Sequence, residues 1–162
     1  MSASITLEIG NIEGLQALVS RIAKFTKLNE HELLTEIGAL GESQTRRRIT
    51  SEKTAPDGSP WPKNKEGTSI LHKTGRHLLD SIAYTVSGNT TEWGASWEFA
   101  HVHQNGAVIK PKTAKALSFM MGGKRVSAKQ VTIPARPFVG LSAANGNEIQ
   151  HLVTDYLGSL LK

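Results

Sequence analysis

The sequence predicts an α+β fold in which helices from both ends of the chain pack on a central, mainly antiparallel sheet. Apolar residues recur every three or four positions between residues 12 and 49 and again between 149 and 160, a spacing typical of amphipathic helices. Between residues 82 and 133, apolar residues alternate with polar ones in short runs broken by glycine, as in strands. Strands grouped in the middle of a chain favour α+β over alternating α/β. With 162 residues, we expect a single domain over 1–162.

The first elements are predicted to be a strand and two helices. Residues 4–11 alternate in polarity and predict a short strand. Asn11 is then a candidate N-cap for a helix with a buried stripe. Asn29, with Glu32 three positions later, has the capping-box spacing and predicts a second helix that runs toward Ile49. The stripe residues of the two helices are Ile12, Leu15, Leu18, Val19, Ile22, Phe25, Leu33, Ile37 and Leu40.

Two features of the second predicted helix need an explanation. Gly38 and Gly41 lie inside it, where each costs up to about 1 kcal/mol relative to alanine, so we expect close packing or a bend there. Arg46–Arg48 lie near its end. There they can form a charged C-terminal turn that favours the helix dipole, or else a binding patch.

Residues 51–69 predict a long loop, because they are rich in Pro, Gly, Ser and charge and show no apolar periodicity. Loops of this length are usually functional or disordered. Trp61 stands between Pro60 and Pro62 in this loop. Its indole either folds back as an anchor or contacts a partner.

The rest of the chain predicts strands followed by a helix. Thr74 is a candidate cap for a short helix, and residues 82–95 predict a β-hairpin that turns at Gly88 and Asn89. Further β-prone runs cover 106–121, 124–134 and 138–142. A last helix is predicted to start near Asn145, with Glu148 completing a capping box and a stripe of Ile149, Leu152, Val153, Tyr156, Leu157 and Leu160.

Residues 131–145 read VTIPARPFVGLSAAN and contain two prolines around a lone arginine. Pro134 and Pro137 each fix their own φ and bias the preceding residue toward extended backbone, so the segment cannot be an ordinary central strand. We expect a stiff track that holds Arg136 outward while Phe138 anchors it on the core. Arg136 would then pair with a carboxylate of a neighbouring subunit, or alternatively fix the turn within its own chain.

The net charge of +5 is confined to one part of the chain. Residues 99–147 contain no acidic residue and seven basic ones: Lys110, Lys112, Lys115, Lys124, Arg125, Lys129 and Arg136. Such a block attracts a polyanion or an acidic protein face, or else it is a solvated surface that keeps the protein soluble. The chain has no cysteine, which excludes disulfides and thiolate metal sites. It also has no export-signal or membrane-anchor pattern, so we expect synthesis in the cytosol and no membrane partner.

The candidate catalytic residues form no recognised constellation. His101 and His103 are two positions apart and would share a face of a strand, which suggests a zinc site in a metal-dependent hydrolase. No third ligand follows from the spacing, so we interpret them as residues that cap or stack. Nucleophile-elbow, P-loop and dinucleotide motifs are absent from the sequence. We therefore expect no enzymatic activity, no cofactor and no metal.

Four motifs in order, followed by a terminal amphipathic helix, resemble the phage virion morphogenesis family. They are PDGSPW (residues 56–61), LHKTGRHLLDSI (71–82), FAHVHQNG (99–106) and IPARPFVGLS (133–142). The resemblance extends over most of the chain beyond about residue 30. Phe99 departs from it, because tyrosine is common there, and the loop at Asp57 looks longer than in some members.

The resemblance implies a structural protein of contractile-tailed or Mu-like phages that completes the tail or the head-to-tail junction. The implied partners are further copies of the chain in a ring, expected to be a hexamer, and the tail tube and head-connector proteins, with DNA passing through the junction as a further candidate. The implied location is the virion, after assembly in the host cytoplasm.

Combining this resemblance with the residue patterns, we expect the interfaces to use the proline track, the loop tryptophan and the basic block. The candidate residues are Arg136, Pro134, Pro137, Trp61, Lys110, Lys112, Lys115, Lys124, Arg125 and Lys129. The alternative function is that of a small basic nucleic-acid-binding protein that uses residues 110–136.

Overall fold

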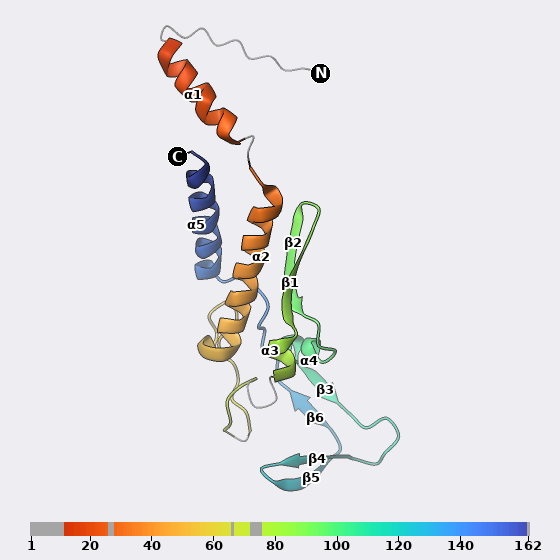
Figure 1. The fold of residues 1–162 in the computed structure, drawn as a ribbon. Helices are drawn as coiled ribbons and strands as arrows, with labels where there is room; N and C mark the ends of the chain where they lie inside the picture. The colour runs from red at the N-terminus through yellow and green to blue at the C-terminus, as the bar shows by residue number, and fades with distance from the viewer. Residues whose placement is uncertain (1–11, 26–27, 66, 72–75, 162) are drawn as a thin grey trace.

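The computed structural model describes residues 12–25, 28–65, 67–71 and 76–161 and confirms the α+β class (Figure 1). The predicted strand at 4–11 and the predicted cap Thr74 lie outside the described residues. In chain order the elements are α1 (Ile12–Lys24), α2 (Glu30–Arg47), the π-helix η2 (Arg48–Glu52), α3 (Arg76–Asp80), β1 (Ile82–Ser87), β2 (Thr90–Ala95), α4 (Ala100–Asn105), β3 (Ala107–Ile109), β4 (Leu117–Met121), β5 (Lys124–Ala128), β6 (Val131–Ile133) and α5 (Ala143–Leu160).

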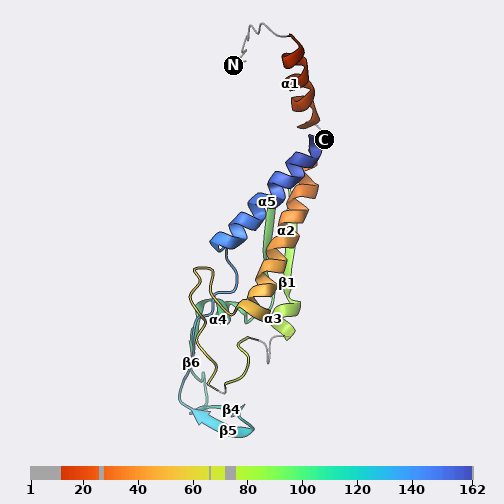
Figure 2. The same ribbon diagram turned by 90° about the vertical axis from the view of Figure 1, so that its left-hand side faces the viewer.

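Helix α2 is the central element of the fold. It lies between α5 on one side and the β1–β2 hairpin on the other, as Figures 1 and 2 show. Asn29 caps it as predicted, since its side chain accepts a hydrogen bond from the Glu32 amide. Gly38 and Gly41 face the hairpin and allow its aromatic residues, Tyr84 and Trp93, to approach the helix backbone closely. The prediction of close packing at these glycines is confirmed.

The strands form three separate two-stranded antiparallel sheets in the described chain, rather than one central sheet. β1 pairs with β2, β3 with β6, and β4 with β5. The predicted turn at Gly88 and Asn89 is confirmed, because Ser87 pairs with Thr90. β3 and β6 have three residues each, and prolines follow closely after both, Pro111 and Pro134. Because proline cannot donate a ladder hydrogen bond, this pairing stays short.

Two boundary predictions near the C-terminus are wrong. Residues 138–142 form no strand. Helix α5 begins at Ala143, and its N-cap is Ser142 rather than Asn145. Asn145 is the third residue of the helix and completes a capping box with Ser142, so Glu148 is free to pair elsewhere.

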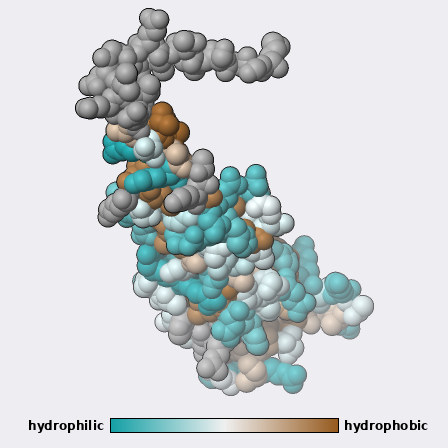
Figure 3. Space-filling model, turned by 45° about the horizontal axis from the view of Figure 1, so that its top comes forward, coloured by the Kyte–Doolittle hydropathy of each residue, from teal (hydrophilic) through white to brown (hydrophobic). Residues whose placement is uncertain are grey.

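The hydrophobic core lies at the lower end of α2, around η2. Its buried members are Ile49, Ala55, Trp61, Leu71, Leu78, Ile82, Ala100 and Phe138. At the opposite end, the predicted buried stripe of α1 is wrong for its described side chains, because Val19, Ile22 and Phe25 are exposed. Apolar surface is visible at this end of the molecule in Figure 3. No helix in the described part of the chain is long and apolar enough to cross a membrane.

Replacing Gly41 with alanine tests the contact between α2 and the hairpin. A Cβ atom there would lie 2.4 Å from Cδ2 of the Trp93 ring, so the helix and hairpin must separate. We expect the free energy of unfolding in chemical denaturation to fall by about 1–3 kcal/mol. The control is Gly158→Ala in α5, where no atom lies within 4 Å of the new Cβ; it is expected to be neutral or slightly stabilising. Equal stability of the two variants would contradict the packing described here.

Candidate interaction surfaces

Arg48 connects three segments that are far apart in the sequence. Its side chain is 1% exposed. Nη1 donates to the carbonyl oxygens of Phe138 (3.0 Å) and Gly140 (2.7 Å), and Nη2 donates to Oδ1 of Asn145. Glu52 provides a carboxylate oxygen 3.9 Å from Nε. This guanidinium therefore fixes the end of the proline track and the start of α5 on the last turn of the α2–η2 helix.

The other two arginines of the triplet also contact their own chain. Arg46 donates to the carbonyl oxygens of Leu79 and Ile82, at 2.7 Å each, and pairs with Glu42. Arg47 pairs with Glu52 and with Glu148 of α5. All three arginines thus bind groups of their own chain. The triplet connects segments within the fold, which neither the charged-turn nor the binding-patch interpretation described.

Glu148 connects α5 to α2 through two partners. Its carboxylate accepts hydrogen bonds from Nε2 of Gln44 (2.8 Å) and Nη2 of Arg47 (2.8 Å). The Gln44 hydrogen bond, followed by the contacts with Arg47, lowers the pKa of the Glu148 carboxyl below its ordinary value. The sequence alone placed Glu148 in a capping box and missed this role.

Gln104, at the end of α4, holds the proline track from the other side. Its Oε1 accepts hydrogen bonds from the backbone amides of Phe138 (2.9 Å) and Val139 (3.1 Å), while Nε2 donates to the Val139 carbonyl. These bonds occupy the backbone groups that a strand would need, which explains why residues 138–142 form none. Phe138 is 1% exposed, and its predicted role as the anchor of the track is confirmed.

Arg136 is not held outward, so that part of the prediction is wrong. The residue is 6% exposed; Nε donates to the Pro62 carbonyl (2.9 Å) and Nη2 to the Lys63 carbonyl (3.4 Å). Its backbone amide also donates to the His103 carbonyl, at 2.7 Å. The Arg136 side chain therefore binds its own chain, as the second of the two interpretations predicted. A contribution to an interface between subunits stays a prediction.

The Trp61 side chain folds back onto its own chain. Of the two alternatives for this residue, the internal anchor is the one that the structure shows. It is buried in the core, and its Nε1 donates to the Pro137 carbonyl at 3.1 Å. Pro137 is thus held between the loop tryptophan and the anchored Phe138. Together with the Arg136 bonds, this contact fixes the loop at 60–63 against the proline track.

A groove lies between this loop and the strands that follow α4. It has a volume of about 420 Å³. The β4–β5 hairpin turns its alternate residues toward the groove, so that Phe119, Met121, Val126 and Ala128 form an apolar wall. Lys63 and Lys65 line the loop side, and His103, Pro134 and Arg136 line the inner side.

The six other predicted basic residues lie on residues 107–133, which we call the basic arm. The arm consists of β3 to β6 and extends away from the helices, as Figure 1 shows. It contains no acidic residue. Lys110, Lys112, Lys115, Lys124, Arg125 and Lys129 are all exposed. The structure therefore places these five lysines and Arg125 on one projection. Trp61, another predicted interface residue, is buried in the core and does not belong to this projection.

The histidine pair lies on a helix rather than a strand. His101 and His103 are in α4, where residues two positions apart point in different directions. The described residues contain no cluster that could hold a metal ion. His103 stacks on Trp97 with ring centroids 5.7 Å apart. Burial, together with the nearby Arg136 charge, lowers the pKa of the His103 imidazole.

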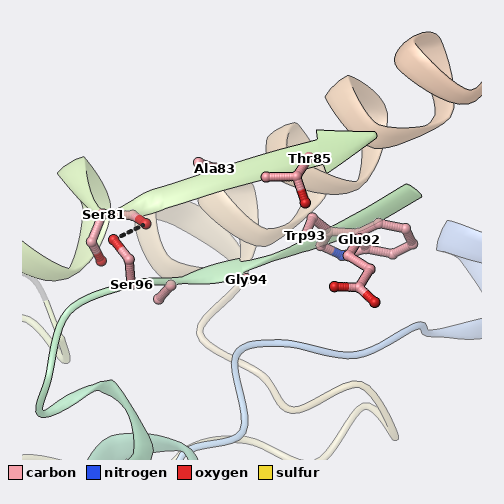
Figure 4. Close-up of a pocket in the computed structure, with 8 residues that line it drawn as sticks. Ser81, Ala83, Thr85, Glu92, Trp93, Gly94 and Ser96 are labelled. Atoms are coloured by element: carbon pink, nitrogen blue, oxygen red, sulfur yellow. Dashed lines mark hydrogen bonds between the residues drawn. The ribbon is translucent and has the colours of Figure 1, made fainter. Parts of the chain in front are cut away.

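A second, shallower hollow of about 320 Å³ lies on the outer face of the β1–β2 hairpin (Figure 4). Its lining is mostly of small residues, including Ala83 and Gly94. At one end, the Ser96 hydroxyl donates to the Ser81 carbonyl at 3.4 Å, the bond drawn in Figure 4, and the Ser96 amide donates to the same oxygen at 3.1 Å. Glu92 is the one charged residue that lines the hollow. The hollow therefore has the character of a packing surface.

Comparison with known proteins agrees with the resemblance. Residues 11–158 match the phage virion morphogenesis family, and the chain belongs to it. A relative in Haemophilus influenzae, the Mu-like prophage FluMu G protein 2, is 26% identical over 98% of this chain and 99% of its own length. The tail completion protein S of Escherichia phage P2 is 26% identical over 86% of this chain and 92% of its own length. No solved structure matches the chain.

Removal of the Arg48 side chain tests the central clamp. In Arg48→Leu, two carbonyl oxygens and the Asn145 amide oxygen lose their buried donor. Each unsatisfied buried group costs about 1–3 kcal/mol, so we expect the free energy of unfolding to fall by about 3 kcal/mol or more. The matched control, Arg125→Leu on the exposed arm, is expected to change it by less than about 0.5 kcal/mol. A loss of the same size in both variants would contradict the role of Arg48.

The half-buried His103 predicts a pH dependence of stability. Its pKa is lower in the folded chain than in the unfolded chain, so the unfolded state binds more protons at mildly acidic pH. Stability is therefore complete above the unfolded pKa of about 6.5 and falls as the pH drops toward the folded pKa. Urea unfolding between pH 5 and 8 should show this slope, and His103→Gln should reduce it. His101→Gln is the control; a slope unaffected by the His103 change would refute this assignment.

Proposed function

We propose that this protein completes the phage tail and acts as a ring at the head-to-tail junction. The observation that carries the proposal is the family match over residues 11–158, together with the relative named tail completion protein S, which covers 86% of the chain. The proposed role is structural: the protein contributes a shaped surface to the particle. Its location would then be the virion, at the tail end or neck, after assembly in the host cytoplasm.

Two features of the surface support contacts with other components of the particle. An exposed apolar patch suits a protein interface, and a charged projection suits a partner of opposite charge. Val19 and Ile22 of α1, with Phe25 just after it, are exposed at one end of the molecule, and the basic arm projects at the other. Large exposed apolar side chains grouped on one helix are typical of an interaction site. A hexamer is the expected form.

The basic arm fits an acidic protein surface better than DNA. Six exposed positive charges would bind phosphates, but every neutralised phosphate adds affinity that resists the sliding of DNA through a junction. An acidic face of the tail tube or of a head-connector protein does not need to slide past the arm, so strong binding there has no such cost. We therefore assign the arm to protein partners, with nucleic-acid binding as the alternative that the experiment must separate.

Phage particles assembled without this protein provide the test. We expect tails that fail to join to heads and a loss of infectivity that the wild-type chain restores. A variant with all six arm residues changed to glutamine should fold normally but restore infectivity at least tenfold less, because the arm loses its attraction for an acidic partner. Native mass spectrometry of the chain bound to isolated tail tubes would measure the ring.

The same preparation separates the alternatives. Complete, DNA-filled and infectious particles without the protein would contradict the proposed function. Low-micromolar binding to DNA that survives moderate salt would instead favour the nucleic-acid-binding alternative. A monomer on the tail tube would contradict the ring but not tail completion.

A further inference from the structure

The groove beside Arg136 combines a buried positive charge with an apolar wall. Arg136 is 6% exposed and lines the groove. No ion pair joins its guanidinium to a carboxylate of the described residues. A buried charge without a partner is costly, and arginine removed from water is normally paired with a carboxylate or phosphate.

The hydrogen bonds of Arg136 leave part of the guanidinium available. Nε and Nη2 donate to two backbone carbonyls, and no described acceptor bonds to Nη1. A guanidinium has five N–H donors, so an incoming carboxylate has donors to bind. The adjacent His103 is neutral at pH 7, because burial and Arg136 lower its pKa, and adds no second positive charge.

The apolar wall defines the rest of the occupant. Phe119, Met121 and Val126 face a space of about 420 Å³, within the usual range of about 300–1,000 Å³ for binding pockets. An aromatic side chain fills such a space well and buries a large apolar area. Lys63 and Lys65 on the rim add further positive charge. The complementary group is therefore a carboxylate next to an aromatic ring.

This chain carries such a pair on its own surface. Glu98 and Phe99 are adjacent and both are exposed; Phe99 is 49% exposed, and its ring makes an edge contact with Trp97. Glu98 forms no ion pair with a described residue. This pair, which we call the knob, lies beside the groove: the Trp97 ring contacts Phe99 on one side and the groove-lining His103 on the other, with ring centroids 5.5 and 5.7 Å apart. The knob and the groove are nevertheless formed by different residues, and a closed ring requires two different, complementary patches on each subunit.

We propose that Glu98 and Phe99 of one subunit insert into the groove of the next subunit, with the carboxylate on Arg136 and the ring against Phe119, Met121 and Val126. This inference rests on the proposed ring and specifies its contact. The occupant is a second copy of the chain, in a head-to-tail arrangement around the ring. The groove and the knob then form one interface, repeated between each pair of neighbours.

Cysteine cross-linking in assembled particles tests the contact, because the natural chain has no cysteine. In the variant Lys65→Cys with His101→Cys, which keeps Glu98 and Phe99, a short thiol-reactive cross-linker should give a ladder of covalent multimers, since His101 is exposed two positions after Phe99. Neither single variant should give a ladder. The matched control combines His101→Cys with Ser87→Cys, at the exposed end of the β1–β2 hairpin, and should give none either.

A charge change in the same cysteine background tests Arg136 without disturbing its buried side chain. Glu98→Gln should lower the yield of multimers at least tenfold. Glu92→Gln, which removes an exposed acid from the hairpin, should leave it unchanged. A normal yield in Glu98→Gln would overturn the assigned role of the carboxylate.

The remaining outcomes distinguish this inference from the proposed function. Particles that are infectious but yield only monomers, or cross-links to a different virion protein, overturn the inference and leave tail completion intact. Failure of the wild-type chain to restore infectivity to particles that lack it overturns the proposed function instead. Multimers that form only with the Ser87 control pair would assign the interface to the hairpin and also overturn the inference.

Discussion

The structure depends on one buried guanidinium. Arg48 lies at the junction of α2 and η2, and its bonds reach the carbonyls of Phe138 and Gly140 and the side chain of Asn145. An arginine in this position cannot be replaced by a point charge, because its planar fork supplies several donors in fixed directions. The C-terminal third of the chain is therefore held to the central helix by polar contacts that surround Phe138, the largest apolar side chain in the group of fully buried residues.

This clamp explains why the proline track is a rigid platform. Between Pro134 and Gly140, the backbone makes no strand pairing, yet almost every part of it has a partner. Arg136 is bound through its amide and its side chain, Pro137 accepts from Trp61, and Gln104 binds the next two amides. Gly106 opposes the track so closely that a Cβ atom there would lie 2.8 Å from the Ala135 nitrogen. The basic arm begins just after Gly106 and ends just before the track. Because these two segments are packed together, the base of the arm is held in place.

Local patterns in the sequence predicted most helices and turns correctly. The features that were missed depend on polar contacts between residues far apart in the sequence. The α2 cap, the β1–β2 turn and the packing at Gly38 and Gly41 follow from spacing and from the lack of a side chain, which are properties of neighbouring residues. The α5 cap was misplaced because Ser142 and Asn145 both fit the pattern, and only the bond from Arg48 to Asn145 decides between them. The burial of Arg136 was missed for the same reason: its acceptors, the carbonyls of Pro62 and Lys63, are more than 70 residues away.

The two buried arginines differ in the groups that surround their charge. Arg48 donates to three acceptors in its own chain; its buried Nε has no hydrogen-bond partner among the described groups, but the Glu52 carboxylate lies 3.9 Å from it. Arg136 has two carbonyl acceptors, no carboxylate among the described residues, and a groove in front of it. Breaking a bond at the first site would leave polar groups unsatisfied within the fold, whereas the described residues place no carboxylate in an ion pair at the second. The same residue type, buried to nearly the same extent, thus has a carboxylate beside its charge at one site, and backbone carbonyls and a groove beside it at the other.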